Sequence, residues 1–353
     1  MPTPQNILTR KTSSAVFLVH TIDDGGESTV RDALADLAGL VSAVGSRAPE
    51  SALTAVAGIG SDAWDRLYSG PRPAGLRPFT ELHGAVHTAP ATAGDLLIHI
   101  KADRMDLCFE VGQKWAESVR DAVTTVDEVH GFRYFDLRDM IGFVDGTENP
   151  TGQDAVDAIT VGDEDPDFAG GSYVVIQRYV TDFESWNSLS VENQERAIGR
   201  TKLDNIEMDD DVKPTNSHIA LNVVTDEDGE EIDVVRDNMP YGDVSGGGER
   251  GTFYIAYSRG PDVSEEMLRR MFIGEPEGNH DRLLDFTTAV TGSQFYVPTG
   301  DFLADPPPAP FPDAANPDDH EPVPERPADG SPTDGSPTDG SPTDGSLGIG
   351  SLR

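Results

Sequence analysis

Cysteine is nearly absent from this sequence, because Cys108 is the only one in 353 residues. A single thiol excludes an internal disulfide. It also excludes a CxxC zinc site and an iron–sulfur cluster that is held by several thiolates. Such low cysteine usage fits a reducing compartment.

Basic residues are also scarce. There are 26 lysines and arginines against 63 aspartates and glutamates, which gives a net charge of −37. A surface this acidic repels the phosphates of nucleic acids and the head groups of anionic lipids. We therefore expect neither nucleic acid nor membrane as a partner, and a high-salt habitat is an alternative reason for the charge.

Long hydrophobic runs are missing as well, since no stretch approaches the roughly 18 apolar residues of a membrane span. Near the N-terminus the apolar run 15–19 is short, and His20 and acidic residues follow it. This pattern indicates a strand rather than a signal peptide. The sequence predicts a cytoplasmic protein.

The first half of the chain alternates short apolar runs with amphipathic segments. Runs rich in β-branched residues predict strands, and apolar residues at helical spacing predict helices. Ser28 and Ser61 are the predicted N-caps of the first two helices. The predicted strands are 13–22, 52–60, 95–102 and 124–135, and the predicted helices are 30–48, 61–69 and 105–123. This order is that of a ferredoxin-like unit, an antiparallel sheet with helices on one face.

The second half predicts a similar series without clear sequence identity to the first. Its predicted strands are 171–180, 218–224, 231–238 and 251–259, and its predicted helices are 184–189, 190–199 and 264–272. We therefore predict an α+β protein of two tandem ferredoxin-like units, arranged like a dimeric α+β barrel. The predicted units span 1–140 and 141–303.

The character of the chain changes from about residue 304. The segment 304–346 is rich in proline and contains a perfect DGSPT repeat from 329 to 343. It cannot bury enough apolar surface to offset the entropy of ordering, so it predicts a disordered linker. Apolar residues return in the last segment, 347–353, as Leu347, Ile349 and Leu352.

The segment GFVDGTENP, residues 142–150, is the most distinctive motif. An isolated Asp-Gly pair is usually an ordinary turn. Here the turn follows Met140, Ile141, Phe143 and Val144, so apolar residues surround the Asp145 carboxylate. Such surroundings allow a carboxyl group to change protonation state during a reaction.

At this motif the chain resembles the dye-decolourising peroxidases, whose hallmark is GxxDG, followed here by TENP. Three further segments agree with that family in the right order: TNSHIALN (215–222), VVRDNMPYG (234–242) and DRLLDFTTAVTG (281–292). The resemblance covers roughly residues 10 to 300. The pattern is similar to that of the bacterial subgroup of short chains.

The resemblance implies haem b as the cofactor, with His218 as the proximal ligand of the haem iron. The second nitrogen of such an imidazole donates to an acceptor that fixes its tautomer and raises its basicity. Asp285 is the candidate acceptor, and a solvent-facing aspartate is the alternative.

The resemblance also assigns a distal acid and a distal arginine. Asp145 corresponds to the acid, which can shuttle a proton between the two oxygens of peroxide. Arg236 corresponds to the arginine, whose fixed charge can stabilise the charge that develops as the O–O bond breaks. A surface salt bridge or a contact with a haem propionate is the alternative for Arg236. Asn238 is expected to share a face with Arg236 and to orient the peroxide or a water. We expect the loss of Arg236 to cost more than the loss of Asp145.

Further residues are assigned to the edge of the cofactor. Arg200 is a candidate partner for a haem propionate, and a surface arginine is the alternative. Gly146, Thr147 and Glu148 are expected to contribute backbone beside the haem.

The predicted function is the oxidation of dyes, phenols or other small reductants by hydrogen peroxide. A haem-binding or haem-handling protein with little turnover is the alternative, and a scaffold without haem is a third possibility. Asp145 and Arg236 favour the enzyme, because storage needs only the axial ligand. The ending DGSLGIGSLR looks like the peptide that directs cargo into encapsulin nanocompartments, so 347–353 is predicted to bind a shell protein. Homo-oligomers are expected from the resemblance.

Overall fold

One antiparallel sheet joins strands from both halves of the chain. The computed structural model describes residues 2–226, 228–245 and 248–310. Within them, ten strands follow the order β6-β1-β5-β2-β12-β7-β10-β8, with β11 paired to β7 and β9 paired to β10. The strands are β1 (Ser14–Ile22), β2 (Thr54–Gly60), β5 (Leu96–Ala102), β6 (Val123–Phe132), β7 (Ser172–Thr181), β8 (Val235–Arg236), β9 (Met239–Gly242), β10 (Arg250–Ser258), β11 (Thr287–Ala289) and β12 (Ser293–Val297). A separate hairpin pairs β3 (Leu82–His83) with β4 (Thr88–Ala89).

Alternate side chains of these strands form an apolar core between the two halves. Phe17 of β1, Phe253 of β10 and Phe295 of β12 lie in it and are fully buried. The rings of Phe17 and Phe253 stack with centroids 4.0 Å apart. Strand β6 also approaches β9, since a Cβ on Gly131 would lie 2.5 Å from the Cβ of Met239. The sheet therefore curls around a shared interior, as the α+β prediction with a barrel-like arrangement requires.

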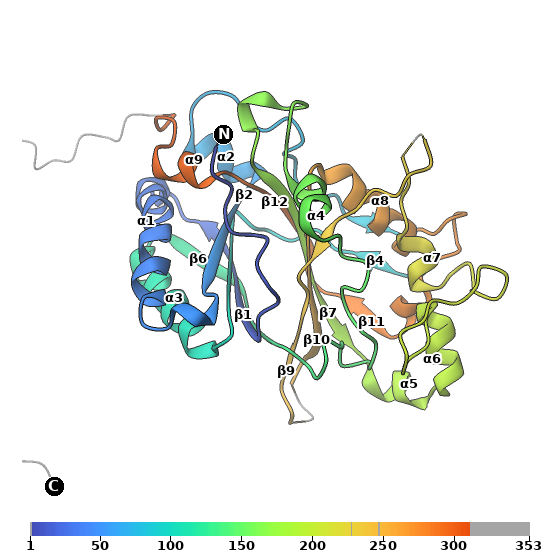
Figure 1. The fold of residues 1–353 in the computed structure, drawn as a ribbon. Helices are drawn as coiled ribbons and strands as arrows, with labels where there is room; N and C mark the ends of the chain where they lie inside the picture. The colour runs from blue at the N-terminus through green and yellow to red at the C-terminus, as the bar shows by residue number, and fades with distance from the viewer. Residues whose placement is uncertain (1, 227, 246–247, 311–353) are drawn as a thin grey trace, which may run out of the picture. The chain divides into compact units, whose positions relative to one another are not determined.

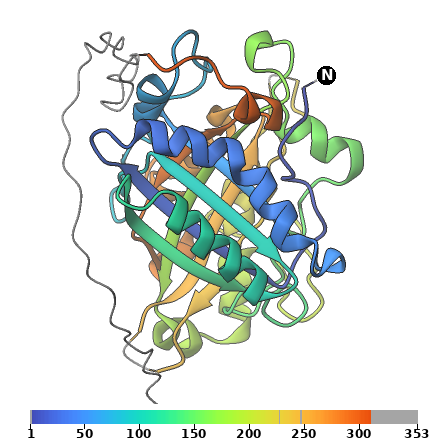
Figure 2. The same ribbon diagram turned by 90° about the vertical axis from the view of Figure 1, so that its left-hand side faces the viewer.

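Helices cover the outer faces of the sheet. In the first half, α1 (Glu27–Gly45) and α3 (Met105–Ser118) pack side by side across the strands (Figure 2). In the second half, α8 (Pro261–Phe272) packs near α7 (His218–Asn222) on the other side of the sheet (Figure 1). The remaining helices are α2 (Ser61–Leu67), α4 (Gly152–Ile159), α5 (Phe183–Ser188), α6 (Val191–Ile198) and α9 (Gly300–Ala304), with 3₁₀ turns η1 (Pro49–Ser51), η2 (Pro166–Phe168) and η3 (Arg282–Asp285). In the described part of the chain, no helix combines the length and the apolar character that crossing a membrane requires.

Several local predictions were wrong. The segment 218–224 was predicted as a strand but begins with the short helix α7, because Ser217 caps it by accepting a hydrogen bond from the amide of Ala220. The predicted strand 231–238 shortens to β8. Ser28 and Ser61 lie inside their helices, whose N-caps are Gly26 and Gly60.

The start of the predicted linker is held against the rest of the protein. The carbonyl of Pro307 accepts a hydrogen bond of 2.8 Å from Arg31, and that of Pro308 accepts one of 2.9 Å from the amide of Ser69. Residues 311–353, which include the terminal segment 347–353, lie outside the described residues. The division at 140/141 stays a prediction.

Two glycines test this packing in opposite directions. Gly131→Ala places a Cβ against Met239, whose Cβ cannot move without its strand, so we expect ~1–3 kcal/mol less stability. Gly39→Ala lies on the exposed side of α1, where the new Cβ meets no described atom within 4 Å apart from the neighbouring backbone of its own helix, so we expect a gain of ~0.5–1 kcal/mol. Urea unfolding measures the free energy of unfolding of both variants. Equal changes in that free energy would contradict the importance of the close contact between β6 and β9.

Candidate active site

A large cavity lies between the second half of the sheet, helices α7 and α8, and the GFVDGTENP loop. It holds about 900 Å³ of empty space, part of it open to solvent. Most of the surface of its walls is apolar, although nine of its seventeen lining residues are charged or carry an imidazole, an amide or a threonine hydroxyl. Polar groups in apolar walls are typical of a ligand pocket. The lining residues are Asp139, Ile141, Phe143, Val144, Asp145, Tyr179, Thr181, Ile198, His218, Asn222, Arg236, Asn238, Thr252, Tyr254, Met271, Leu283 and Thr287.

His218 is the first residue of α7, and a buried carboxylate holds its ring. The Nδ1 atom lies 2.6 Å from Oδ2 of Asp281, whose side chain is fully buried. The other oxygen of Asp281 accepts a hydrogen bond of 2.8 Å from the amide of Leu283, so Asp281 is also the N-cap of η3. With Nδ1 engaged, Nε2 is the nitrogen that can ligate a metal, and a carboxylate behind a ligating imidazole is a common arrangement.

The predicted partner of His218 was therefore wrong. Asp285 lies at the far end of η3, where it contacts His87 and His280 instead. Its side chain is 40% exposed, whereas that of Asp281 is fully buried. Asp281 starts the same DRLLDF segment and precedes a short helical turn, so its N-cap position was the signal that could have identified it.

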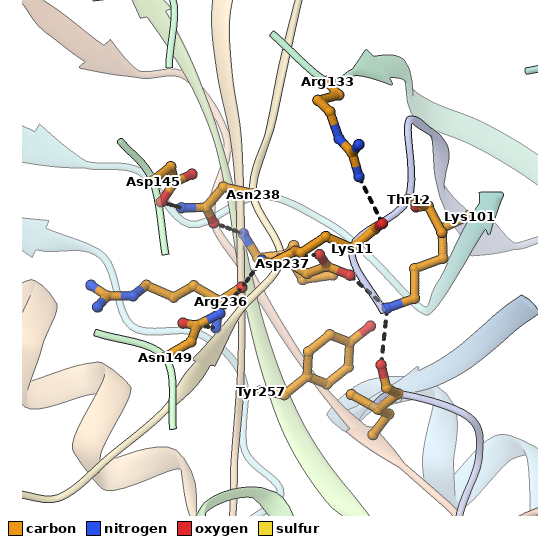
Figure 3. A network of polar contacts seen from close by, with 12 residues as sticks. Lys11, Thr12, Lys101, Arg133, Asp145, Asn149, Arg236, Asp237, Asn238 and Tyr257 are labelled. Atoms are coloured by element: carbon orange, nitrogen blue, oxygen red, sulfur yellow. Dashed lines mark hydrogen bonds and ion pairs between the residues drawn. The ribbon is translucent and has the colours of Figure 1, made fainter. Parts of the chain in front are cut away.

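Asp145, Arg236 and Asn238 meet at the same cavity, as predicted. The Asn238 amide Nδ2 lies 3.3 Å from Oδ1 of Asp145, and its Oδ1 accepts a hydrogen bond of 3.0 Å from the amide of Ile255 (Figure 3). Arg236 is fixed by its backbone, because its amide donates to Oδ1 of Asn149 at 3.0 Å and its carbonyl accepts from Nδ2 of Asn149 at 2.6 Å. The guanidinium Nε of Arg236 is buried and has no hydrogen-bond partner among the described residues.

A buried ion pair lies beside Arg236 and Asn238, on the side away from Asp145 (Figure 3). Lys101 of β5 lies 2.6 Å from Oδ2 of Asp237, and the two side chains are 4% and 9% exposed. Lys11 contacts the other oxygen of Asp237 at 3.3 Å and donates to the carbonyl of Arg236 at 2.8 Å. Burial would raise the pKa of Asp237, but the charges of Lys101 and Lys11 hold it well below its ordinary value. The pair links the first half of the chain to the segment that carries Arg236 and Asn238.

Comparison with known proteins identifies the family of this chain. The profile of the Dyp-type peroxidase N-terminal domain matches residues 4–133, and that of the C-terminal domain matches residues 136–302. The chain belongs to the Dyp-type peroxidase family. A dye-decolorizing peroxidase from Mycolicibacterium paratuberculosis is 62% identical over 309 residues, which cover 88% of this chain and 87% of that protein. The family confirms the resemblance in the sequence and the prediction of a peroxidase.

Solved structures of family members match the fold as well. The encapsulated DyP-type peroxidase from Mycobacterium smegmatis is 62% identical, with a TM-score of 0.86 over 88% of this chain and 100% of that chain. DypB from Rhodococcus jostii is 53% identical, with a TM-score of 0.84 over 86% of this chain and 97% of that chain. Variants of that DypB were solved in complex with heme. The ferredoxin-like α+β fold of this peroxidase is thereby confirmed.

The residues predicted at the cofactor edge gather beside the cavity but do not line it. Arg200 pairs with Glu148, and its Nε lies 3.1 Å from Oδ1 of Asn205. Asn205 donates to the hydroxyl of Thr147 at 2.9 Å. Gly146 has a φ of +74°, a conformation that favours glycine in the turn after Asp145. A contact between Arg200 and a propionate stays a prediction, because the Glu148 carboxylate occupies its guanidinium in this structure.

Sequence reasoning missed a second carboxyl group in the cavity of this peroxidase. Asp139 accepts hydrogen bonds from the hydroxyl of Thr252 and, at 3.1 Å, from the amide of Ile141. Burial raises the pKa of Asp139, and the charge of Asp145 adds to that effect. Burial also raises the pKa of Tyr254 to about 12. Asp139 lies only six residues before Asp145, but it became a candidate only when the bend of the loop was known.

The buried ion pair gives a prediction about stability. Lys101→Met leaves the Asp237 carboxylate with Lys11 as its one cationic contact, and we expect the loss to cost about 3 kcal/mol. Lys114→Met is the control, because its pair with Glu110 on α3 is exposed and should be worth less than about 0.5 kcal/mol. Urea unfolding at neutral pH measures both variants. A loss for Lys101→Met no larger than that of the control would show that the pair does not hold the two halves together.

Proposed function

We propose that this chain is a haem-dependent peroxidase whose cavity binds haem b with His218 as the proximal ligand. The observation that carries the proposal is the hydrogen bond of 2.6 Å between His218 and the buried Asp281. It leaves Nε2 as the ligating nitrogen. The largely apolar walls of the cavity, and the buried Nε of Arg236, which has no partner among the described residues, fit an apolar group with negative charges nearby.

His218 would hold the haem, which supplies the iron and the redox chemistry when bound. The Asp281 carboxylate keeps the His218 proton on Nδ1 and makes the imidazole a more basic ligand. Because Asp281 is also the N-cap of η3, the orientation of the ring depends on the fold of that turn.

Asp145, Asn238 and Arg236 would handle the peroxide. The Asn238 amide points at Oδ1 of Asp145, so Oδ2 is the oxygen that takes the first proton of peroxide and returns it to the leaving oxygen. Arg236 supplies a fixed positive charge where negative charge develops as the O–O bond breaks. Asp139 is a second carboxyl group in the cavity, and its raised pKa suits it to hold a proton there. The oxidised substrates would be dyes, phenols or other small reductants.

Absorption spectra of the haem-loaded protein test the ligand. We expect His218→Ala to lose haem or to shift the Soret band, while His83→Ala, an exposed histidine beside Glu81, leaves the spectrum unchanged. One equivalent of hydrogen peroxide should change the Soret band of the wild type. An unaltered Soret band in His218→Ala would overturn the assignment, and a wild type that does not respond to peroxide would favour a haem-handling protein.

Turnover of a dye tests the peroxide side. We expect kcat/KM to fall about 100-fold in Asp145→Ala and about 1000-fold in Arg236→Leu, with haem retained in both. The loss of Arg236 should cost more, because water can carry a proton in place of Asp145 but cannot replace a fixed positive charge. Activity near that of the wild type in both variants would remove these two residues from the mechanism.

We further propose that the protein is packaged inside an encapsulin shell in the cytoplasm through residues 347–353. The Mycobacterium smegmatis relative is an encapsulated peroxidase. The terminal segment carries apolar residues at 347, 349 and 352 after a repetitive linker, which suits binding as an extended peptide in an apolar groove. A homo-oligomer is proposed on the family resemblance.

Co-expression with the shell protein tests this targeting. Deletion of 347–353 should leave peroxidase activity unchanged and abolish co-purification with the shell. Deletion of one DGSPT repeat, 334–338, is the matched control and should change neither. Continued packaging without 347–353 would refute the targeting role.

A further inference from the structure

Two histidines that the proposed mechanism does not use, His87 and His280, both contact Asp285. His87 Nε2 and His280 Nε2 each lie 3.1 Å from the same oxygen, Oδ1 of Asp285. The two imidazole side chains are 21% exposed and the carboxylate is 40% exposed. The ring centroids are 4.8 Å apart with the planes at 70°, so the rings meet edge to face.

This convergence has the dimensions of a metal-ligand set. One ligand atom from each of the three residues lies within 4.8 Å of the other two, and no other group of three potential ligands of this kind occurs in the described residues. Zinc binds imidazole nitrogen and carboxylate oxygen at about 2.0–2.2 Å, which in a tetrahedron puts neighbouring ligand atoms about 3.3–3.6 Å apart. The two distances of 3.1 Å are already close to that range.

The segments that carry these ligands are anchored independently. His87 lies in the turn between β3 and β4, where its carbonyl accepts a hydrogen bond of 2.9 Å from the amide of Gly84. Gly84 packs so closely on the end of α8 that a Cβ there would lie 1.9 Å from the carbonyl oxygen of Phe272. Asp285 ends η3, whose other end is fixed by the buried Asp281. A metal ion would therefore meet ligands that need little rearrangement.

The charge of the cluster also suits a cation. Asp285 contributes a carboxylate oxygen to the cluster, and its two imidazole partners can each offer a ring nitrogen. The net charge of the whole chain is −37, which attracts cations to its surface.

We propose that His87, His280 and Asp285 form a binding site for a divalent transition metal ion of the zinc class, with water completing the coordination. Two imidazoles and one carboxylate suit Zn²⁺, Cu²⁺ or Ni²⁺ better than the hard cations Mg²⁺ and Ca²⁺, which prefer oxygen ligands. The ion would tie the β3–β4 turn to η3.

Zinc binding by the full-length, haem-loaded protein tests the site. We expect one Zn²⁺ per chain in isothermal titration calorimetry with ZnCl₂, unaffected by millimolar Mg²⁺. Because loss of a direct ligand should cost at least as much as loss of a supporting residue, the affinity should fall at least about tenfold in His87→Gln, His280→Gln and Asp285→Asn. Thermal unfolding should shift upward with Zn²⁺ in the wild type and not in these variants.

His130→Gln is the matched control, because His130 lies 2.7 Å from Glu128 in an exposed pair to which the described part of the chain adds no third ligand. It should bind Zn²⁺ like the wild type. Equal Zn²⁺ uptake by the wild type and by a variant that combines His87→Gln, His280→Gln and Asp285→Asn would overturn the proposal. The cluster would then be three hydrogen-bonded side chains without a metal-binding role. The Soret band should be the same in every variant, so this test and the test of His218 can fail separately.

Discussion

The Lys101–Asp237 ion pair is the interaction on which the rest of the structure depends. It is formed by a strand of the first half and by the residue between Arg236 and Asn238, and both charges are almost inaccessible to water. Two charges are costly to bury, so the pair is maintained only while both halves stay in register. The packing of the two halves against each other thereby fixes the positions of Arg236 and Asn238, the residues on either side of Asp237. A surface salt bridge would not do this, because solvent would screen it and its side chains could move.

A second constraint acts on the other wall of the cavity. Asp281 both starts a short turn and orients an imidazole, so one carboxylate performs a structural and a chemical task. The same turn ends at Asp285, which faces a different set of partners. Only three residues of chain thus separate the aspartate of the interior site from the aspartate of the surface cluster.

The sequence could predict the residues that a local motif carries. Asp145 was found because apolar residues precede it in GFVDGTENP. Arg236 was assigned from the resemblance to the dye-decolourising peroxidases, and Asn238 from its position two residues further along. The structure brings all three to one cavity. The order of strands and helices in the first half was also predictable, since burial imposes its period on each segment. In the second half, β12, which lies between β2 and β7 in the sheet, was not predicted. The short helix at His218 was missed, because five residues are too few for a helical period to show.

What the sequence could not predict depends on contacts between distant residues. Asp281 and Asp285 lie in the same DRLLDF segment, and the N-cap position of Asp281 is the one local cue between them. The contact of Asp281 with His218 and its full burial are visible only in the fold. Asp139 depends on the bend of its loop. The partnership of Lys101 with Asp237 spans 136 positions and has no local pattern at all.

The two hydrogen bonds between the Asn149 side chain and the backbone of Arg236 have a consequence beyond the loop itself. Arg236 is in the last strand of the sheet order, and the carboxamide binds both its amide and its carbonyl, as the backbone of an adjacent strand would. The Asn149 side chain thus occupies the backbone groups that an additional strand would bind, so this edge of the sheet cannot pair with another chain at that position. Because one carboxamide spans the gap, the number of residues between Asp145 and Asn149 acts as a spacer that an insertion or deletion would upset.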